Sequence, residues 1–436
     1  MILVYTHTIT SRLTYTLDLV FGSVLGIPHH VTDDLETYRD SFIPKIAYTN
    51  ENKGFGVFIE SDPLLFETYT RQVLPVVSGT YLDFPVFFKV KEAAFLPYDI
   101  FATVFYFASR YEEYLPYETD KHKRFQAEQS LAFKNGILDK PFLNYLIADF
   151  AQKLKQSFSI LEFPEQAFRY LSTIDIDNAF AHANKGFKRN AGGMAKDLAS
   201  FKWKEAGNRI QSNLNEAKDP YNTFDLINAL GTETQTALQY FVLIGDYAAY
   251  DKNPDYRNPG FRKLLKGLSD KHSMGLHPSY ESFKHPEKIQ IEKTRLEEII
   301  GKKITSARCH FLRIKFPDTY RHFIEAGITD DYTMIYASQC GFRTGLCMPY
   351  KWFDLQKNEV TELTVHSSVV MEGTLRDYNK LTAANAEGIV NQLLNEVKHF
   401  GGEFVSIFHN DSFMKGQEQW IEVYRHLLIN TNSHNS

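Results

Sequence analysis

The amino-acid sequence predicts an α/β fold, in which a smaller mixed α/β domain precedes a distorted (β/α) barrel of about seven strands. Two patterns lead to this prediction. In residues 166–436, apolar strand-like segments alternate with amphipathic helical segments, as in the βα units that build a parallel sheet. In residues 1–165, short strand-like segments come first and longer helical segments follow. We therefore place the domain boundary between residues 165 and 166.

The composition is that of an ordinary folded protein. The chain has 436 residues, of which 43% are hydrophobic and 23% are charged. Its net charge of −5 is spread without long runs of one sign, so neither a nucleic acid nor a membrane is expected as a partner. Arg12 and Asp18 interrupt any apolar leader, and the three cysteines lack a CxxC spacing. We therefore expect a cytoplasmic protein with free thiols.

The region before residue 166 contains both kinds of element. Alternating apolar residues predict short strands, at residues 1–8, 45–50, 55–60 and 85–90. Apolar residues at helical spacing predict two helices, at residues 99–115 and 140–158.

The region after residue 165 contains the predicted barrel. Its expected strands are residues 170–177, 237–246, 272–279, 304–313, 328–337, 361–370 and 403–411. Its expected helices are residues 262–272, 287–303, 317–327, 384–400 and 417–430. Residues 181–222 are too long for a simple connection and are expected to form an insertion that shapes the mouth of the barrel. The chemistry of such a barrel lies at the carboxyl ends of its strands.

A pair of carboxylates stands at the end of the first predicted barrel strand. Asp175 and Asp177 are two residues apart, so the alternation of a strand turns both side chains to the same side. Two neighbouring carboxylates repel each other, which is costly unless a cation or an arginine neutralises them.

Basic residues occupy three further strand ends. His277 and His409 follow apolar runs at two of them, and Arg308 and His310 share one face of a third. A carboxylate pair, three histidines and an arginine on four separate strand ends indicate one shared site.

Together these residues resemble the polysaccharide deacetylase family, carbohydrate esterase family four, whose catalytic domain is a distorted barrel of βα units. The resemblance implies that Asp175 is the catalytic base and that Arg308 orients it. It also implies that Asp177 and His277 bind a divalent metal ion, and that His409 protonates the leaving group.

The chain departs from the family pattern at three positions. Ile176 separates two aspartates that are adjacent in most members of the family. Glu281 stands where the family has a second metal-binding histidine, and His310 stands where it has a proline. We favour His310 as the third metal ligand, because it shares a strand face with Arg308, and Glu281 is the alternative. Ligation rich in nitrogen favours zinc.

Three more residues are candidates for binding a substrate. Glu372 ends another predicted barrel strand, where it could bind a substrate hydroxyl. Asp331 lies at a strand edge, and Arg343 lies in a turn-like segment that is rich in glycine.

The amino-terminal region has a resemblance of its own. Residues 97–144 are similar to an uncharacterised domain that often precedes such deacetylases in bacteria. A possible role of residues 1–165 is to dock partner enzymes of surface-polysaccharide synthesis.

The resemblance implies a metal-dependent hydrolase that removes N-acetyl groups from an amino sugar or polysaccharide, so the expected partner is a carbohydrate substrate. One alternative is a catalytically impaired sugar-binding protein on the deacetylase fold. Another is a hydrolase of a different non-peptide C–N bond. Metal content, activity on an acetylated amino sugar and a panel of substrates distinguish these three functions.

Overall fold

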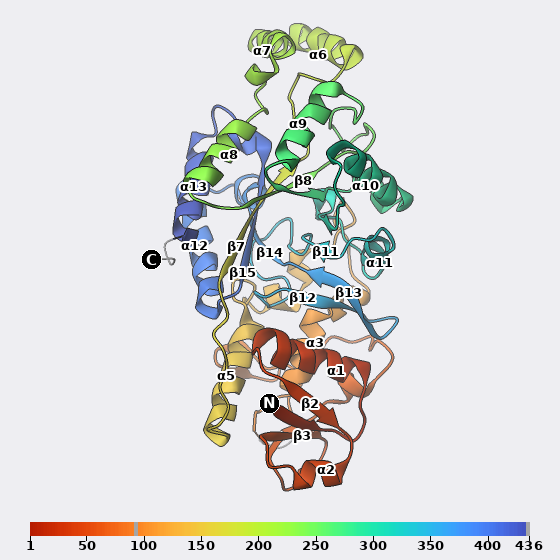
Figure 1. Ribbon diagram of the computed structural model, residues 1–436, viewed down its shortest axis with the longest axis vertical. Coiled ribbons are helices and arrows are strands. Elements are labelled where there is room, and N and C mark those ends of the chain that lie inside the picture. The colour runs from red at the N-terminus through yellow and green to blue at the C-terminus, as the bar shows by residue number, and fades with distance from the viewer. Residues whose placement is uncertain (91–94, 433–436) are drawn as a thin grey trace.

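The computed structural model of the chain describes residues 1–90 and 95–432. The molecule is elongated, as Figure 1 shows. A small sheet built from the first residues lies at one end, a large sheet lies in the middle, and a pair of helices lies at the other end (Figure 1).

The small sheet is parallel and has the strand order β2-β1-β3-β4. Its strands are β1 (Ile2–Tyr5), β2 (His29–Thr32), β3 (Lys45–Thr49) and β4 (Val57–Glu60). The helices of this part of the chain are α1 (Ser11–Leu17), α2 (Leu35–Asp40), α3 (Ile100–Ala108), α4 (Leu131–Lys134) and α5 (Phe142–Ser157). Helices α1 and α3 lie between the small and the large sheet (Figure 1).

The prediction of a strand at residues 85–90 was wrong. In place of a strand at residues 85–90, the chain forms a two-residue strand, β6 (Phe84–Pro85), which pairs with β5 (Thr80–Tyr81). Phe88 adopts a φ of 53°, and this left-handed conformation is incompatible with a continuing strand.

The large sheet has nine strands in the order β12-β13-β11-β10-β9-β8-β7-β15-β14. All neighbours are parallel except β12 and β13. The strands are β7 (Arg169–Ile176), β8 (Leu238–Val242), β9 (Ser273–Leu276), β10 (Ser306–Ala307), β11 (Asp330–Asp331), β12 (Tyr350–Asp354), β13 (Glu359–Val365), β14 (Ser368–Met371) and β15 (Glu403–His409).

The sheet differs from the predicted barrel of about seven strands. Eight of its strands are parallel, because the segment predicted as one strand at residues 361–370 contributes to both β13 and β14. Only residues 366–367 separate these two strands in the chain. They nevertheless lie toward opposite edges of the sheet, where β13 pairs with β11 and β14 pairs with β15. Within the described ranges, β14 and β12 are the two edges of the sheet, so the ladder of backbone hydrogen bonds does not close. The antiparallel strand β12 was not predicted.

Helices follow most of the parallel strands, as the alternating pattern predicted. Their bounds are α6 (Phe187–Ala199), α7 (Trp203–Leu214), α8 (Phe224–Glu233), α9 (Pro259–Ser269), α10 (Glu287–Ile300), α11 (Asp318–Glu325), α12 (Ala383–Phe400) and α13 (Glu418–Asn432). Helix α12 packs against β14 and β15, α10 packs against β9, and α11 packs against β13. These contacts bury the apolar faces of the helices and hold the strand ends in place.

One continuous hydrophobic cluster joins the two sheets, because it contains buried side chains from β1, α3, α5, β7 and α12. The predicted domain boundary between residues 165 and 166 lies in the connection between α5 and β7, and it stays a prediction. None of the helices formed by the described residues combines the length and the hydropathy needed to cross a lipid bilayer.

Candidate metal and proton-transfer site

Three predicted ligands converge at the carboxyl ends of the parallel strands. Asp177 follows β7, His277 follows β9 and His310 follows β10. One ligand atom of each residue lies within 4.8 Å of the ligand atoms of the other two, an arrangement that could hold a metal ion. Nε2 of His277 lies 3.1 Å from Oδ1 of Asp177, and Nε2 of His310 lies 3.4 Å from Oδ2. We call these three residues the ligand cluster.

The hydrogen bonds around the ligand cluster fit a metal ion. Nδ1 of His277 is 2.6 Å from the backbone carbonyl of Arg308, which can only accept, so Nδ1 donates and Nε2 presents a lone pair. Nδ1 of His310 donates in the same way to Asp251, at 2.9 Å. Among the described residues, no hydrogen-bond partner is found for the buried Oδ1 of Asp177. Two ring nitrogens and an unsatisfied carboxylate oxygen therefore face one another, as the ligands of a cation do.

The charges of the ligand cluster also fit a cation. Burial lowers the pKa of His310, but Asp177 and Asp251 outweigh this effect and raise the pKa to about 9. The apo site therefore favours a proton on His310, and a divalent metal ion would displace that proton.

Asp175 lies beside the ligand cluster in a different environment. Its side chain is buried at the end of β7, and Oδ1 accepts a hydrogen bond of 2.6 Å from Nη1 of Arg308. Arg308 is itself held because it donates to Thr173 Oγ1 and to the backbone carbonyl of Tyr332. Oδ2 of Asp175 lies 3.9 Å from Nε2 of His277, so one carboxylate oxygen is bound by the arginine and the other faces the ligand cluster.

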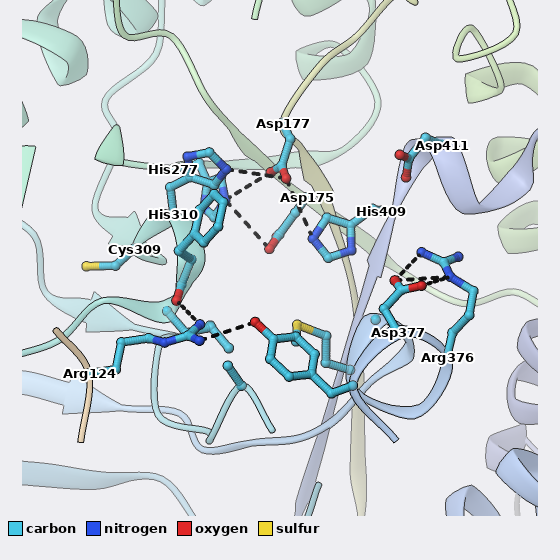
Figure 2. A pocket seen from close by; sticks show the side chains of 16 residues that line it. Arg124, Asp175, Asp177, His277, Cys309, His310, Arg376, Asp377, His409 and Asp411 are labelled. Atoms are coloured by element: carbon cyan, nitrogen blue, oxygen red, sulfur yellow. Dashed lines mark hydrogen bonds and ion pairs between the residues drawn. The ribbon is translucent and has the colours of Figure 1, made fainter. Parts of the chain in front are cut away.

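His409 lies on the other side of the aspartates, as Figure 2 shows. The strand register pairs it with Asp175, and its Nε2 lies 3.9 Å from Oδ2 of Asp177. Nδ1 of His409 is 2.8 Å from Oε1 of Glu372, which also accepts hydrogen bonds from the backbone N–H of His409 and from Ser412. Burial lowers the pKa of His409, but the Glu372 carboxylate outweighs it and raises the pKa well above its ordinary value.

A pocket of about 290 Å³ is lined by the ligand cluster together with Asp175 and His409. Its wall also includes Arg376, Asp377, Tyr378 and Asp411, which follow strands β14 and β15. Arg124, from the part of the chain before β7, reaches the same pocket and donates to the backbone carbonyl of Phe311 and to the hydroxyl of Tyr378 (Figure 2). The amino-terminal part of the chain therefore helps to form the site.

The three predicted substrate-binding residues do not line this pocket within the described part of the chain. Glu372 is buried behind His409, and Asp331 is buried in hydrogen bonds to Tyr320 and Thr333. Arg343 is buried in an ion pair of 2.6 Å with Glu113. Glu372 therefore contacts the site through His409, whereas Asp331 and Arg343 are bound by residues outside the pocket. The alternative ligand Glu281 is also outside the ligand cluster, because it lies in the short helical turn that follows His277.

Sequence reasoning missed Asp251, which is fully buried and orients His310. Asp251 also accepts a hydrogen bond from the backbone N–H of Tyr280, so it joins the loop after β8 to the loop after β9. No motif marks this aspartate, because it lies in an irregular loop whose path depends on the tertiary structure. Arg124 was missed for the same reason.

Comparison with known proteins identifies one matching family. Residues 2–159 match a family of unknown function, DUF7033. No curated protein matches the chain at a significant level.

Several solved structures are similar to the larger part of the chain. A Mycobacterium smegmatis protein assigned as a polysaccharide deacetylase is 14% identical, has a TM-score of 0.42, and aligns over 63% of this chain and 87% of its own. Puue allantoinase is 11% identical with a TM-score of 0.41, over 63% and 87% of the two chains. The polysaccharide deacetylase Bc1974 from Bacillus cereus is 14% identical with a TM-score of 0.30, over 60% and 85%. At these TM-scores the likenesses do not decide the function, which we infer from the geometry of the site.

Proposed function

We propose that this protein is a metal-dependent hydrolase that removes N-acetyl groups from an amino sugar or polysaccharide. The observation that carries the proposal is the ligand cluster, whose ligand atoms lie within 4.8 Å of one another. The Asp175–Arg308 and His409–Glu372 pairs lie beside it. This arrangement provides the three functions that amide hydrolysis needs: a binding site for a cation, a base and an acid.

Zinc is the metal that the ligand cluster fits best. One carboxylate and two imidazoles supply three protein ligands, and catalytic zinc sites usually combine three such ligands with one open position. When bound, the ion would polarise the acetyl carbonyl and lower the pKa of a water molecule. The carbonyl of Arg308 and the carboxylate of Asp251 would keep both imidazoles oriented toward it.

Asp175 is the proposed base. Its carboxylate faces the ligand cluster through Oδ2, while Arg308 binds Oδ1 and restricts its rotation. A carboxylate held in this way is positioned to accept a proton from water. Asp177 pairs with histidines and, within residues 1–90 and 95–432, with no arginine, so we assign the two aspartates different tasks.

His409 is the proposed acid, and Glu372 is its positioning residue. The raised pKa of His409 keeps the imidazole protonated near neutral pH, so it can donate a proton to the departing amine. Glu372 binds Nδ1 and leaves Nε2 directed toward the pocket. Acetate and a free sugar amine are the products.

The pocket is suited to a polar ligand with apolar faces. Phe311, Leu312 and Met371 provide apolar surface, and the side chains of Arg124 and Asp411 provide groups that can hydrogen-bond to hydroxyls. A sugar ring presents both kinds of surface.

The test combines metal analysis with a substrate panel. We expect purified protein to bind zinc at one ion per chain and to release acetate from N-acetylglucosamine or its oligomers, with one free amine for each acetate. The matched control is Asp175→Asn, which should retain the metal and lose turnover. Activity on a cyclic amide but not on acetylated sugars would point to a different C–N hydrolase. Failure to bind any divalent metal would favour a sugar-binding protein without catalytic activity.

A further inference from the structure

Helices α6 and α7 form a helical hairpin that projects from one end of the molecule (Figure 1). The hairpin follows Asp177 in the chain and occupies part of the predicted insertion at residues 181–222. Seven lysines and arginines against two acids give residues 185–214 a net charge of +5, whereas the whole chain has a net charge of −5. The segment is therefore basic in an otherwise acidic protein.

The two helices of the hairpin pack through polar and small residues. Arg209 of α7 forms an ion pair of 2.9 Å with Asp197 of α6, and it also contacts Asn190. Gly193 leaves room for the guanidinium group of Arg209, which a Cβ atom at this position would displace. The interior of the hairpin is thus polar, the reverse of an ordinary helical pair.

The large apolar side chains of the hairpin are exposed instead. On α7, Trp203, Ile210 and Leu214 recur at intervals of seven and four residues, so they share one helix face, and all three are exposed. On α6, Phe187 and Leu198 are eleven residues apart, which again places them on one face, and both are exposed.

The turn between the two helices adds a second aromatic residue to Trp203. Phe201 is 78% exposed and Trp203 is 65% exposed, and their rings lie 6.4 Å apart. Phe201 adopts a φ of 55°, a conformation that favours glycine over a bulky residue. The turn therefore exposes the aromatic side chain of Phe201 at a position where the backbone conformation favours glycine.

The hairpin also exposes basic side chains near these apolar residues in the sequence. Lys188, Lys196, Lys202 and Lys204 are all exposed on or next to the two helices. Lysines beside exposed tryptophan, phenylalanine and leucine on helices too short to span a bilayer are typical of helices that lie in the interface of an anionic membrane. The positive charge complements anionic lipid headgroups, and the apolar stripes complement the acyl region below them.

We propose that the α6–α7 hairpin docks the protein onto the surface of an anionic lipid bilayer. This proposal departs from the sequence-based expectation of no membrane partner, because the structure shows that the apolar residues of this basic segment are exposed to solvent. It is independent of the hydrolase function.

The hairpin is connected to the candidate site. Arg189 of α6 donates to the backbone carbonyls of Lys252 and Asn253, and its guanidinium lies 4.2 Å from the ring centroid of Tyr247. The loop that it contacts contains Asp251, which orients His310 of the ligand cluster. Two connections therefore link the hairpin to the pocket. One is the chain that leads from Asp177 to α6, and the other is the contact between Arg189 and the loop that contains Asp251.

Tryptophan fluorescence tests the docking directly. Of the three tryptophans, Trp352 and Trp420 are buried, so Trp203 alone should respond to a change of surroundings at the surface. We expect a blue shift and co-sedimentation with vesicles of equimolar phosphatidylcholine and phosphatidylglycerol, reduced by high salt and much weaker with phosphatidylcholine alone. Trp203→Phe should remove the blue shift and retain most of the co-sedimentation.

Variants separate the apolar and the electrostatic contributions. The double variant Phe201→Ser with Trp203→Ser should weaken vesicle binding by roughly 10-fold or more. Reversing the charge of Lys196, Lys202 or Lys204 to glutamate should weaken it by roughly 5-fold or more for each residue. The matched control is Phe42→Ser, which removes an exposed phenylalanine far from the hairpin and should leave vesicle binding unchanged.

Three outcomes would overturn the proposal. These are no binding to anionic vesicles, binding that the hairpin variants leave unchanged, and a dimer in solution that the Phe201→Ser and Trp203→Ser variant dissociates. The last result would assign the surface to a second copy of the chain. Asp177→Asn should lose the metal and still bind vesicles normally, because the ligand cluster lies outside the hairpin. A wild-type protein that binds anionic vesicles but has no metal and no activity would disprove the hydrolase function and leave the docking proposal standing.

Discussion

The two sides of the pocket hold their charged groups in opposite ways. In the ligand cluster, two ring nitrogens and a carboxylate face one another, and their free atoms point to a common centre. On the other side, Asp175 is bound by Arg308, and Glu372 is bound by His409, each in a close pair. The difference supports our proposal that one side binds a cation and that the other holds the proton-transfer groups in defined positions. If so, metal binding and turnover should be separable by mutation.

The largest expected effect is the loss of metal from the ligand cluster. His310→Ala should reduce zinc affinity by more than the roughly 10- to 100-fold that follows the loss of an outer-shell partner, because a direct ligand is removed. Asp177→Asn should have the same effect. A zinc titration with a competing chelator measures both. Glu281→Ala is the matched control and should keep near-normal affinity, and the opposite result would make Glu281 the third ligand.

Asp175→Asn should have the next largest effect, and on turnover alone. We expect kcat to fall by roughly 10²- to 10⁴-fold, because the amide cannot act as a base, while the zinc content stays at the wild-type level. Steady-state kinetics together with metal analysis of the same preparation measure both quantities. A variant that loses its zinc would show that Asp175 is a ligand and would remove the distinction between the two sides.

His409→Ala should lower kcat by roughly 10²-fold or more with little change in KM, because its proton is needed only as the C–N bond breaks. Glu372→Gln should change kcat in the same direction by a smaller factor, since the imidazole remains and only its orientation and charge support are weakened. Full kinetic curves for both variants distinguish the effects on kcat and KM. A raised KM with an unchanged kcat would instead assign His409 to substrate binding.

The smallest expected effect concerns the residue behind His310. Asp251→Asn should weaken zinc affinity by roughly 10- to 100-fold, because Asp251 orients a ligand without contacting the metal itself. Asp246→Asn, in the same loop but near the surface, is the control and should bind zinc normally. An Asp251 variant with unchanged affinity would mean that backbone packing alone orients His310.

Much of the candidate site could be predicted from the sequence because its residues follow strands. Asp175, Asp177, His277 and His409 come directly at or after apolar runs, and the carboxyl ends of parallel strands meet at one edge of a sheet. His310 was predicted as the third ligand with Glu281 as the alternative, on the assumption that a strand continues from Arg308 to His310. In the structure β10 has only two residues, and the chain turns into a short helical segment at His310. The structure nevertheless places its ring in the ligand cluster.

The predicted substrate-binding residues show where this reasoning ends. Arg343 was predicted to bind substrate from a turn-like segment, but folding buries it against Glu113, which is 230 residues away in the sequence. Asp331 lies at the end of its short strand, but its side chain is bound by Tyr320 and Thr333. Local patterns do not contain such long-range partners.

The sequence by itself determined the α/β class, the alternation of strands and helices after residue 165, and the strand ends that carry the ligand cluster. These features follow from the local periodicity of apolar residues. Only the tertiary structure decided that the sheet has eight parallel strands without a closed ladder, that Arg124 and Asp251 join the site, and that the α6–α7 hairpin has its polar residues inside. The physical reason is that each of these features depends on which distant surfaces pack together, and burial and charge pairing are set by that packing.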